Sequence, residues 1–138
     1  MLRQRLRWST PDLRRIRRVC FARALHRQCP QCGRGHLFAR WARLSERCQV
    51  CGLIFRREDG AELGSMYLSA TVSQVFAALV FAGIWIATDW SFGPAFLLGA
   101  PIVLAFCYGF LPLSMSTWTA IEYITDVYNC EWWAQPRV

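Results

Sequence analysis

The stretch GSMYLSATVSQVFAALVFAGIWIAT, residues 64 to 88, carries no charged side chain, and Gln74 is its one strongly polar residue. As an α-helix with a rise of 1.5 Å per residue it would be about 37 Å long. The hydrocarbon core of a membrane is about 30 Å thick, so a helix of this length can cross it with some tilt. The stretch therefore predicts a transmembrane helix.

A second uncharged run extends from about residue 92 to 118 and follows after only three residues, 89 to 91. Two spans joined so closely predict a helical hairpin. Small residues recur at intervals of four in both spans, which is typical of helices that pack closely in membranes. The spans contain no charged residue or histidine, so we expect Gln74 to bond between helices rather than serve transport. Close packing is predicted at Ser65, Ser69, Ser73, Gly99 and Gly109.

Charge is divided unevenly along the 138 residues. Residues 1 to 60 hold 15 arginines and four acidic residues, a balance of +11, whereas residues 61 to 138 hold one arginine and five acidic residues, a balance of −4. Because arginines beside membrane helices stay in the cytoplasm, we expect both termini to be cytoplasmic. An arginine-rich mitochondrial transit peptide is the alternative reading of the N-terminal residues.

Two Cys-x-x-Cys-Gly turns lie before the first span, in CPQCGRGHLFARWARLSERCQVCG, residues 29 to 52. Two pairs of cysteines with 15 residues between them match the spacing of four-cysteine zinc sites. Each turn can direct two sulfurs at one metal ion, and four thiolates leave no open coordination position. We expect one structural Zn²⁺ ion, with iron as the main substitute. The predicted ligands are Cys29, Cys32, Cys48 and Cys51.

Disulfides or a redox motif are the competing interpretation of these cysteines. Cytoplasmic thiols are kept reduced, which argues against disulfides if the predicted topology holds. A thioredoxin-like motif would also need a βαβ context, and none is predicted. Between the turns, the apolar side chains are expected to form the small core of a ribbon: Leu37, Phe38, Trp41 and Leu44.

The N-terminal residues predict a basic amphipathic helix that begins near Thr10, with Pro11 in its first turn. Leu13, Ile16 and Cys20 share one face of it, and arginines cover much of the rest. Docking on an anionic membrane surface is the default interpretation, and nucleic-acid binding is the alternative. The residues expected to contact lipid or a partner are Arg14, Arg15 and Arg18.

Acidic residues flank the start of the first span, where Asp59 and Glu62 can complement the positive end of the helix dipole. Contact of this pair with a partner at the membrane surface is the second reading. After the second span, Trp118, Ile121 and Tyr128 lie near one helical face. They predict an interfacial helix on the cytoplasmic surface within residues 119 to 138.

The order of these motifs resembles a bacterial membrane family known as domain of unknown function number 983. The resemblance covers about residues 28 to 125. It is carried by the two cysteine turns with Gly35, Leu37 and Phe38, by Asp59-Gly60, by Gly64-x-Met66-Tyr67-x-Ser69, by Pro112-Leu113 and by Ala120-x-x-Tyr123. The resemblance implies a bacterial inner-membrane location and, as an association only, a role beside respiratory complexes.

The predicted fold is thus a mainly α membrane protein with a small cytoplasmic zinc ribbon of short β-strands, a two-helix hairpin and a C-terminal interfacial helix. The predicted segments are residues 1–27 (basic extension), 28–58 (ribbon), 59–118 (hairpin) and 119–138 (interfacial helix and tail). No nucleophile and base pair or phosphate loop is found, so we expect no enzyme and no small-molecule substrate.

The predicted function is an interaction or assembly module of a larger inner-membrane complex. Membrane lipid, such a complex or a homo-oligomer are the expected partners. Membrane-tethered nucleic-acid binding is the first alternative, and thiol redox or metal handling is the second.

Overall fold

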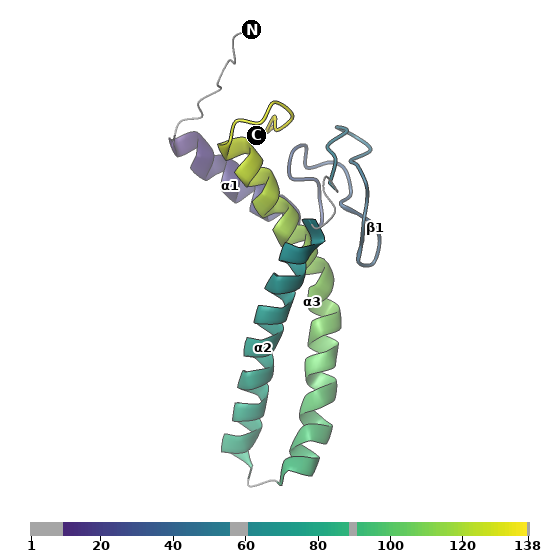
Figure 1. The fold of residues 1–138 in the computed structure, drawn as a ribbon, viewed down its shortest axis with the longest axis vertical. Coiled ribbons are helices and arrows are strands. Elements are labelled where there is room, and N and C mark those ends of the chain that lie inside the picture. Colours follow the sequence, from purple (N-terminus) through teal and green to yellow (C-terminus); the bar gives the residue numbers. More distant parts are fainter. Residues whose placement is uncertain (1–9, 56–60, 89–90, 138) are drawn as a thin grey trace.

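The computed structural model describes residues 10–55, 61–88 and 91–137. Its elements follow the chain as α1 (Thr10–Leu25), β1 (Phe38–Arg40), β2 (Arg43–Leu44), α2 (Ala61–Ala87) and α3 (Phe92–Tyr128). Figure 1 shows α2 and α3 as a long hairpin, with α1, the strands and the C-terminal residues gathered at one end of it. The predicted fold class is confirmed, because the chain is mainly helical with two short strands and two long apolar helices.

The hairpin helices are both long and apolar enough to cross a membrane. Their faces meet through aromatic and small side chains. The rings of Phe76 and Phe106 stack with their centroids 3.8 Å apart. Ser65 is buried and Ser69 and Ser73 are partly buried along α2, at the positions expected to pack.

The glycines of α3 behave differently from each other. A Cβ atom added at Gly99 would lie 2.7 Å from Cε1 of Phe81, so this glycine permits a close approach of α2. Gly109 is exposed, and nothing lies within 4 Å of the Cβ position there. Its predicted role in packing is therefore wrong for the hairpin within one chain, because its helix face points away from α2.

The long helix α3 has 37 residues, so it is about 55 Å long and exceeds what a membrane core needs. Apart from Gly99, its buried residues all lie between Pro112 and Val127. The predicted C-terminal interfacial helix is present only as the last part of α3, since the helix continues without a break to Tyr128. The predicted face is only partly covered, since Tyr128 is 72% exposed. The buried face of this part of α3 is instead the one that carries Ala120, Tyr123 and Val127.

Beyond its first turn α3 contains two prolines, Pro101 and Pro112, and Pro112 is fully buried. Proline lacks the N–H group that would bond the carbonyl four residues earlier. Nearby hydroxyl groups bond to the helix backbone: Ser114 donates to the Leu111 oxygen at 2.9 Å and Ser116 to the Leu113 oxygen at 3.1 Å. These bonds let two fully buried serines remain hydrogen-bonded in an apolar stretch.

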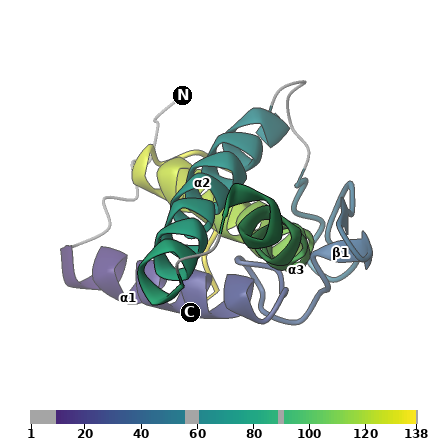
Figure 2. The same ribbon diagram turned by 90° about the horizontal axis from the view of Figure 1, so that it is seen from below.

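One hydrophobic core joins α1, the cysteine-bearing segment, the end of α3 and the C-terminal residues. Its members include Ile16 from α1, Leu37 from the ribbon, Val127 from α3 and Ala134 from the tail. The apolar face of α1 is thus buried within the protein, and Figures 1 and 2 show α1 crossing beside the last part of α3. The predicted segments 1–27, 28–58 and 119–138 share this core, whereas the described residues of segment 59–118 contribute none of its members.

The ribbon is a two-stranded antiparallel sheet, with Phe38 paired to Leu44. Isolated bridges join Gln28 to His36 and Arg47 to Ile54 and so close the chain around both cysteine turns. Leu37 is fully buried, and Phe38 and Leu44 pack against the core as predicted.

Trp41, at the turn between the strands, does not lie in the ribbon core. It is 45% exposed and stacks on Tyr108 of α3, with ring centroids 5.3 Å apart. The guanidinium of Arg27 lies 5.1 Å from the centre of the same indole ring. The core prediction fails for Trp41 because the sheet is too short to cover its turn, and α3 offers the aromatic surface instead.

Candidate metal centre

Each cysteine pair forms a tight turn closed by its glycine. The Gly33 N–H donates to the Cys29 oxygen at 2.8 Å, and the Gly52 N–H donates to the Cys48 oxygen at 3.0 Å. Both glycines have positive φ angles, 67° and 77°. Side chains with a Cβ atom rarely adopt that conformation, so glycine lets the backbone curl around the sulfur atoms.

The four cysteine sulfurs form one cluster, in which all lie within 4.8 Å of one another. The Cys29 and Cys51 sulfurs are 3.6 Å apart, and those of Cys32 and Cys48 are 3.7 Å apart. Four sulfurs about 2.3 Å from a tetrahedral Zn²⁺ ion would be separated by about 3.8 Å. The residues therefore fit a metal ion with four thiolate ligands. These ligands fill the tetrahedral shell, so no coordination position is left for water.

Gly35 makes room for the second turn to approach the first. It is buried, and a Cβ atom added there would overlap the sulfur of Cys48. Its carbonyl oxygen also accepts a hydrogen bond from the Cys29 N–H at 2.8 Å. Any larger residue at this position would push one ligand away from the other three.

The thiols differ in their acidity. Burial acts to raise the pKa of Cys32, but hydrogen bonds from the backbone N–H groups of Arg34 and Gly35 and from the neighbouring thiols lower it to about 7. Burial raises the pKa of Cys29 well above its ordinary value and that of Cys51 to about 11. Metal binding must displace these protons, which makes metal affinity depend on pH.

Arg23 of α1 holds the first cysteine turn in place, which the sequence reasoning did not foresee. Its guanidinium donates to the carbonyl oxygens of Pro30 and Gln31, both at 3.0 Å, and to that of Arg137 at 2.9 Å. Two arginines that are close to the ligands in sequence, Arg34 and Arg47, are exposed. Arg23 lies one turn after Cys20, on the border of the apolar face of α1, and this position is the only sequence signal for its role.

Tyr123 of α3 is the second residue at the centre that the sequence reasoning did not assign to it. It is 1% exposed and belongs to the same core as Cys29 and Cys48. Burial raises its pKa above the ordinary value, and the nearby thiols of Cys20, Cys29 and Cys51 add to that effect. The hydroxyl therefore stays protonated and can act only as a neutral donor or acceptor. Its place in the motif Ala120-x-x-Tyr123 was the available signal.

The predicted surface residues of α1 are exposed, as contact with lipid or a partner requires: Arg14, Arg15 and Arg18. Asp59 and the side chain of Glu62 lie outside the described residues. His26 and His36 are exposed, and the cluster of four sulfurs does not include them.

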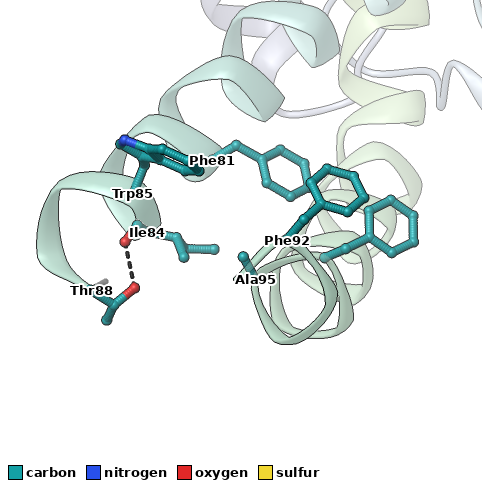
Figure 3. A pocket seen from close by; sticks show the side chains of 7 residues that line it. Phe81, Ile84, Trp85, Thr88, Phe92 and Ala95 are labelled. Carbon is teal, nitrogen blue, oxygen red and sulfur yellow. Dashed lines mark hydrogen bonds between the residues drawn. The ribbon is translucent and has the colours of Figure 1, made fainter. Parts of the chain in front are cut away.

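A separate pocket of about 260 Å³ lies between the helices at the far end of the hairpin (Figure 3). Its lining is almost entirely apolar, and the Thr88 hydroxyl donates to the Ile84 oxygen at 2.6 Å. None of the described lining residues can ionise near neutral pH, so they provide no group for acid–base chemistry. They are Phe81, Ile84, Trp85, Thr88, Phe92, Ala95 and Phe96.

The structure thus defines a class: a four-cysteine ribbon joined through a shared core to a long apolar hairpin. The family model described as "Protein of unknown function (DUF983)" matches residues 38–123, more than half of the chain, and the chain belongs to this family. The match includes Cys48, Cys51, all of α2 and α3 as far as Tyr123, whereas Cys29 and Cys32 precede it. Comparisons with curated proteins and with solved structures found no match.

Proposed function

We propose that this protein is a membrane-anchored interaction module, in which a structural metal centre fixes a small ribbon on a two-span hairpin that binds another membrane protein. The observation that carries the proposal is Gln74. Its amide is exposed midway along α2, and the described residues offer it no hydrogen-bond partner. The bond expected between α2 and α3 is not made, because Gln74 faces away from α3.

The apolar surface of the hairpin supports insertion in a membrane. Large side chains along both helices are exposed, including Leu79 at 66%, Ile86 at 86% and Leu104 at 69%. Only a lipid environment or a covering protein could solvate so much apolar surface. All arginines of the described residues lie at the end of the hairpin that carries α1, the ribbon and the tail. We therefore place that end in the cytoplasm.

Gln74 lies deep within the proposed span. It is 11 residues from Leu63 and 13 from Ala87, or about 16 Å and 20 Å along the helix. A primary amide exposed to hydrocarbon is costly, and pairing with a polar group on another helix removes that cost. Ala70 and Ala78 flank it on the same exposed face and allow close approach. A partner helix, from another protein or a second copy, is the occupant that this face fits.

Photo-crosslinking from Ala78, one turn after Gln74, tests the proposal in native membranes. A benzophenone side chain at position 78 should give an adduct of discrete mass, and the adduct should disappear in a Gln74→Leu background. Leu79 is exposed but lies about 140° around the helix from Gln74, so a crosslinker there serves as the matched control. Lipid adducts alone at position 78, in both backgrounds, would contradict the proposal.

We propose a structural rather than catalytic centre, because four thiolates complete the tetrahedral shell of the metal. The metal would supply a fixed crosslink between two short turns that have too little core to hold themselves.

Nucleic-acid binding is the second candidate, favoured by the basic surface of α1. Because the apolar face of α1 is buried inside the protein, its exposed face carries Arg14, Arg15, Arg17 and Arg18. Binding to phosphates through these side chains would weaken steeply with salt, by a log–log slope of several units. Titration of the purified protein with RNA and DNA between 0.05 and about 0.3 M salt tests it, and a flat response would reject it.

A further inference from the structure

The turn between the two strands of the ribbon carries two arginines that are paired across the sheet. Arg40 of β1 lies opposite Arg43 of β2 in the antiparallel register, and both residues are exposed. Neither guanidinium makes an ion pair or a hydrogen bond with any of the described residues. Like charges directly opposite each other destabilise a pair of strands. The arrangement therefore favours an anion bound between the two side chains.

Trp41, between these arginines in the chain, sets the turn against α3. Its ring stacks on that of Tyr108 with the centroids 5.3 Å apart. Both residues keep a large exposed surface, 45% for Trp41 and 65% for Tyr108. Figures 1 and 2 show the ribbon beside α3, on the side away from α2. Tryptophan and tyrosine with an apolar ring and a polar tip are typical of the membrane interface.

The position of Tyr108 along α3 sets the depth of this turn. Tyr108 is 16 residues beyond Phe92, or about 24 Å along the helix axis. A hydrocarbon core of about 30 Å that begins near Phe92 would end about 6 Å beyond Tyr108. Segments that lie in the membrane interface enter the boundary with the acyl chains by about 5–10 Å. The turn therefore reaches the depth of the lipid headgroups and the first part of their chains.

We propose that the ribbon turn, residues 40–43, inserts into the cytoplasmic interface of the membrane, where Trp41 lies among the lipids and the two arginines bind headgroup phosphates. Arginine binds phosphate through two parallel hydrogen bonds, and its long apolar stem lets the charged end reach the headgroups from below. The inference rests on the membrane insertion and the orientation of the proposed function. It goes further because it makes the ribbon, as well as the hairpin, contact lipid.

Fluorine NMR of the full chain labelled with fluorotryptophan, in nanodiscs of phosphatidylcholine and phosphatidylglycerol, tests the depth of the turn. The Trp41 resonance is assigned by its loss in Trp41→Phe. A lipid with a nitroxide at the glycerol end of its acyl chain should broaden this resonance beyond detection, whereas a soluble gadolinium chelate should leave it visible. Trp132, in the tail and 80% exposed, is the matched control and should respond in the opposite way.

A Trp41 resonance that the soluble chelate removes and the nitroxide lipid leaves visible would overturn the inference. Trp85 of α2, 73% exposed, reports separately on the hairpin. If the nitroxide lipid broadens the Trp85 resonance but not that of Trp41, the inference fails while the hairpin remains inserted. If it broadens neither resonance, membrane insertion and the inference fail together.

Replacement of both arginines tests the phosphate contacts. The double variant Arg40→Gln with Arg43→Gln should expose Trp41 to the soluble chelate, because neutral amides do not attract phosphates as guanidinium groups do. Arg18→Gln, on the exposed face of α1, is the control and should leave the Trp41 resonance unchanged. Equal broadening of the Trp41 resonance in the double variant and in the unmodified chain would show that the arginines do not hold the turn at the headgroups.

Discussion

The indole of Trp118 in α3 lies against the α-carbon of Gly64 in α2, so closely that a Cβ atom on Gly64 would overlap the ring. The ring is fixed in turn by a hydrogen bond from its Nε1 to Oε1 of Glu122, at 2.6 Å. The two helices of the hairpin therefore meet, at the end that carries the metal centre, through a contact that only glycine permits.

Replacement of Gly64 by alanine should destabilise the hairpin by about 1–3 kcal/mol, because the added methyl group displaces a ring that is held on its other side. Gly83→Ala in the same helix is the control, since nothing lies within 4 Å of its Cβ position. Denaturant or thermal unfolding in detergent measures both. Equal losses of stability in the two variants would show that contact with Trp118 does not restrict the size of the side chain at position 64.

Arg23→Lys should loosen the first cysteine turn. One ammonium group cannot reproduce the fork that bonds Pro30, Gln31 and Arg137. Lost bonds to the carbonyl groups of the buried residues Pro30 and Gln31 should lower the stability by about 1–3 kcal/mol. Zinc release to a chelator should become faster in this variant. Arg18→Lys, on the exposed face of α1, should leave the release rate unchanged. An unchanged rate of zinc release in Arg23→Lys would mean that the hydrogen bonds of Arg23 do not support the metal site.

Cys20 should resist alkylation in the metal-loaded protein, whereas the exposed Cys130 should react readily. Burial raises the pKa of Cys20 to about 11 from an ordinary value of 9.0. The reactive species is the thiolate, so a raised pKa lowers the reaction rate at neutral pH, and the rate should increase from pH 9 toward 11. Mass spectrometry after a timed maleimide pulse measures both sites. Equal labelling of Cys20 and Cys130 at pH 7 would contradict the described burial.

Trp41→Ala should weaken the docking of the ribbon turn on α3 without removing the metal. The substitution deletes both the stack on Tyr108 and the contact with Arg27, worth about 0.5–1.5 kcal/mol for an aromatic pair. Protease cleavage between the strands should accelerate while metal content stays the same. Trp132→Ala, at a position 80% exposed, controls for general loss of an aromatic residue. Unaltered cleavage in Trp41→Ala would argue against the stack.

The sequence was sufficient for the features that depend on local spacing. Cys29 and Cys32 lie in one turn, as do Cys48 and Cys51, and two such turns converge whenever the chain between them closes as a hairpin. The hairpin helices follow from uncharged length alone. Long-range contacts could not be predicted from the sequence. Arg23 bonds to Arg137, and Tyr123 shares a core with Cys29, but neither pairing leaves a periodic pattern in the sequence.

The wrong predictions for α3 have a similar cause, because they depended on which face of the helix meets the rest of the protein. Gly109 belongs to a spacing pattern that two faces of α3 satisfy equally well, so spacing cannot tell which face meets α2. The apolar stripe that ends at Tyr128 is not the most buried face of α3, because Tyr123 and Val127 lie in the core instead. Only the position of α1 and the ribbon decides which face of the helix is covered.

X-ray absorption at the metal edge of the purified protein identifies the atoms that bind the metal. We expect one zinc ion per chain with four sulfur neighbours at about 2.3 Å and no nitrogen or oxygen neighbour. A first shell with nitrogen or oxygen ligands, or a metal-free protein whose four cysteines form two disulfides, would contradict this expectation.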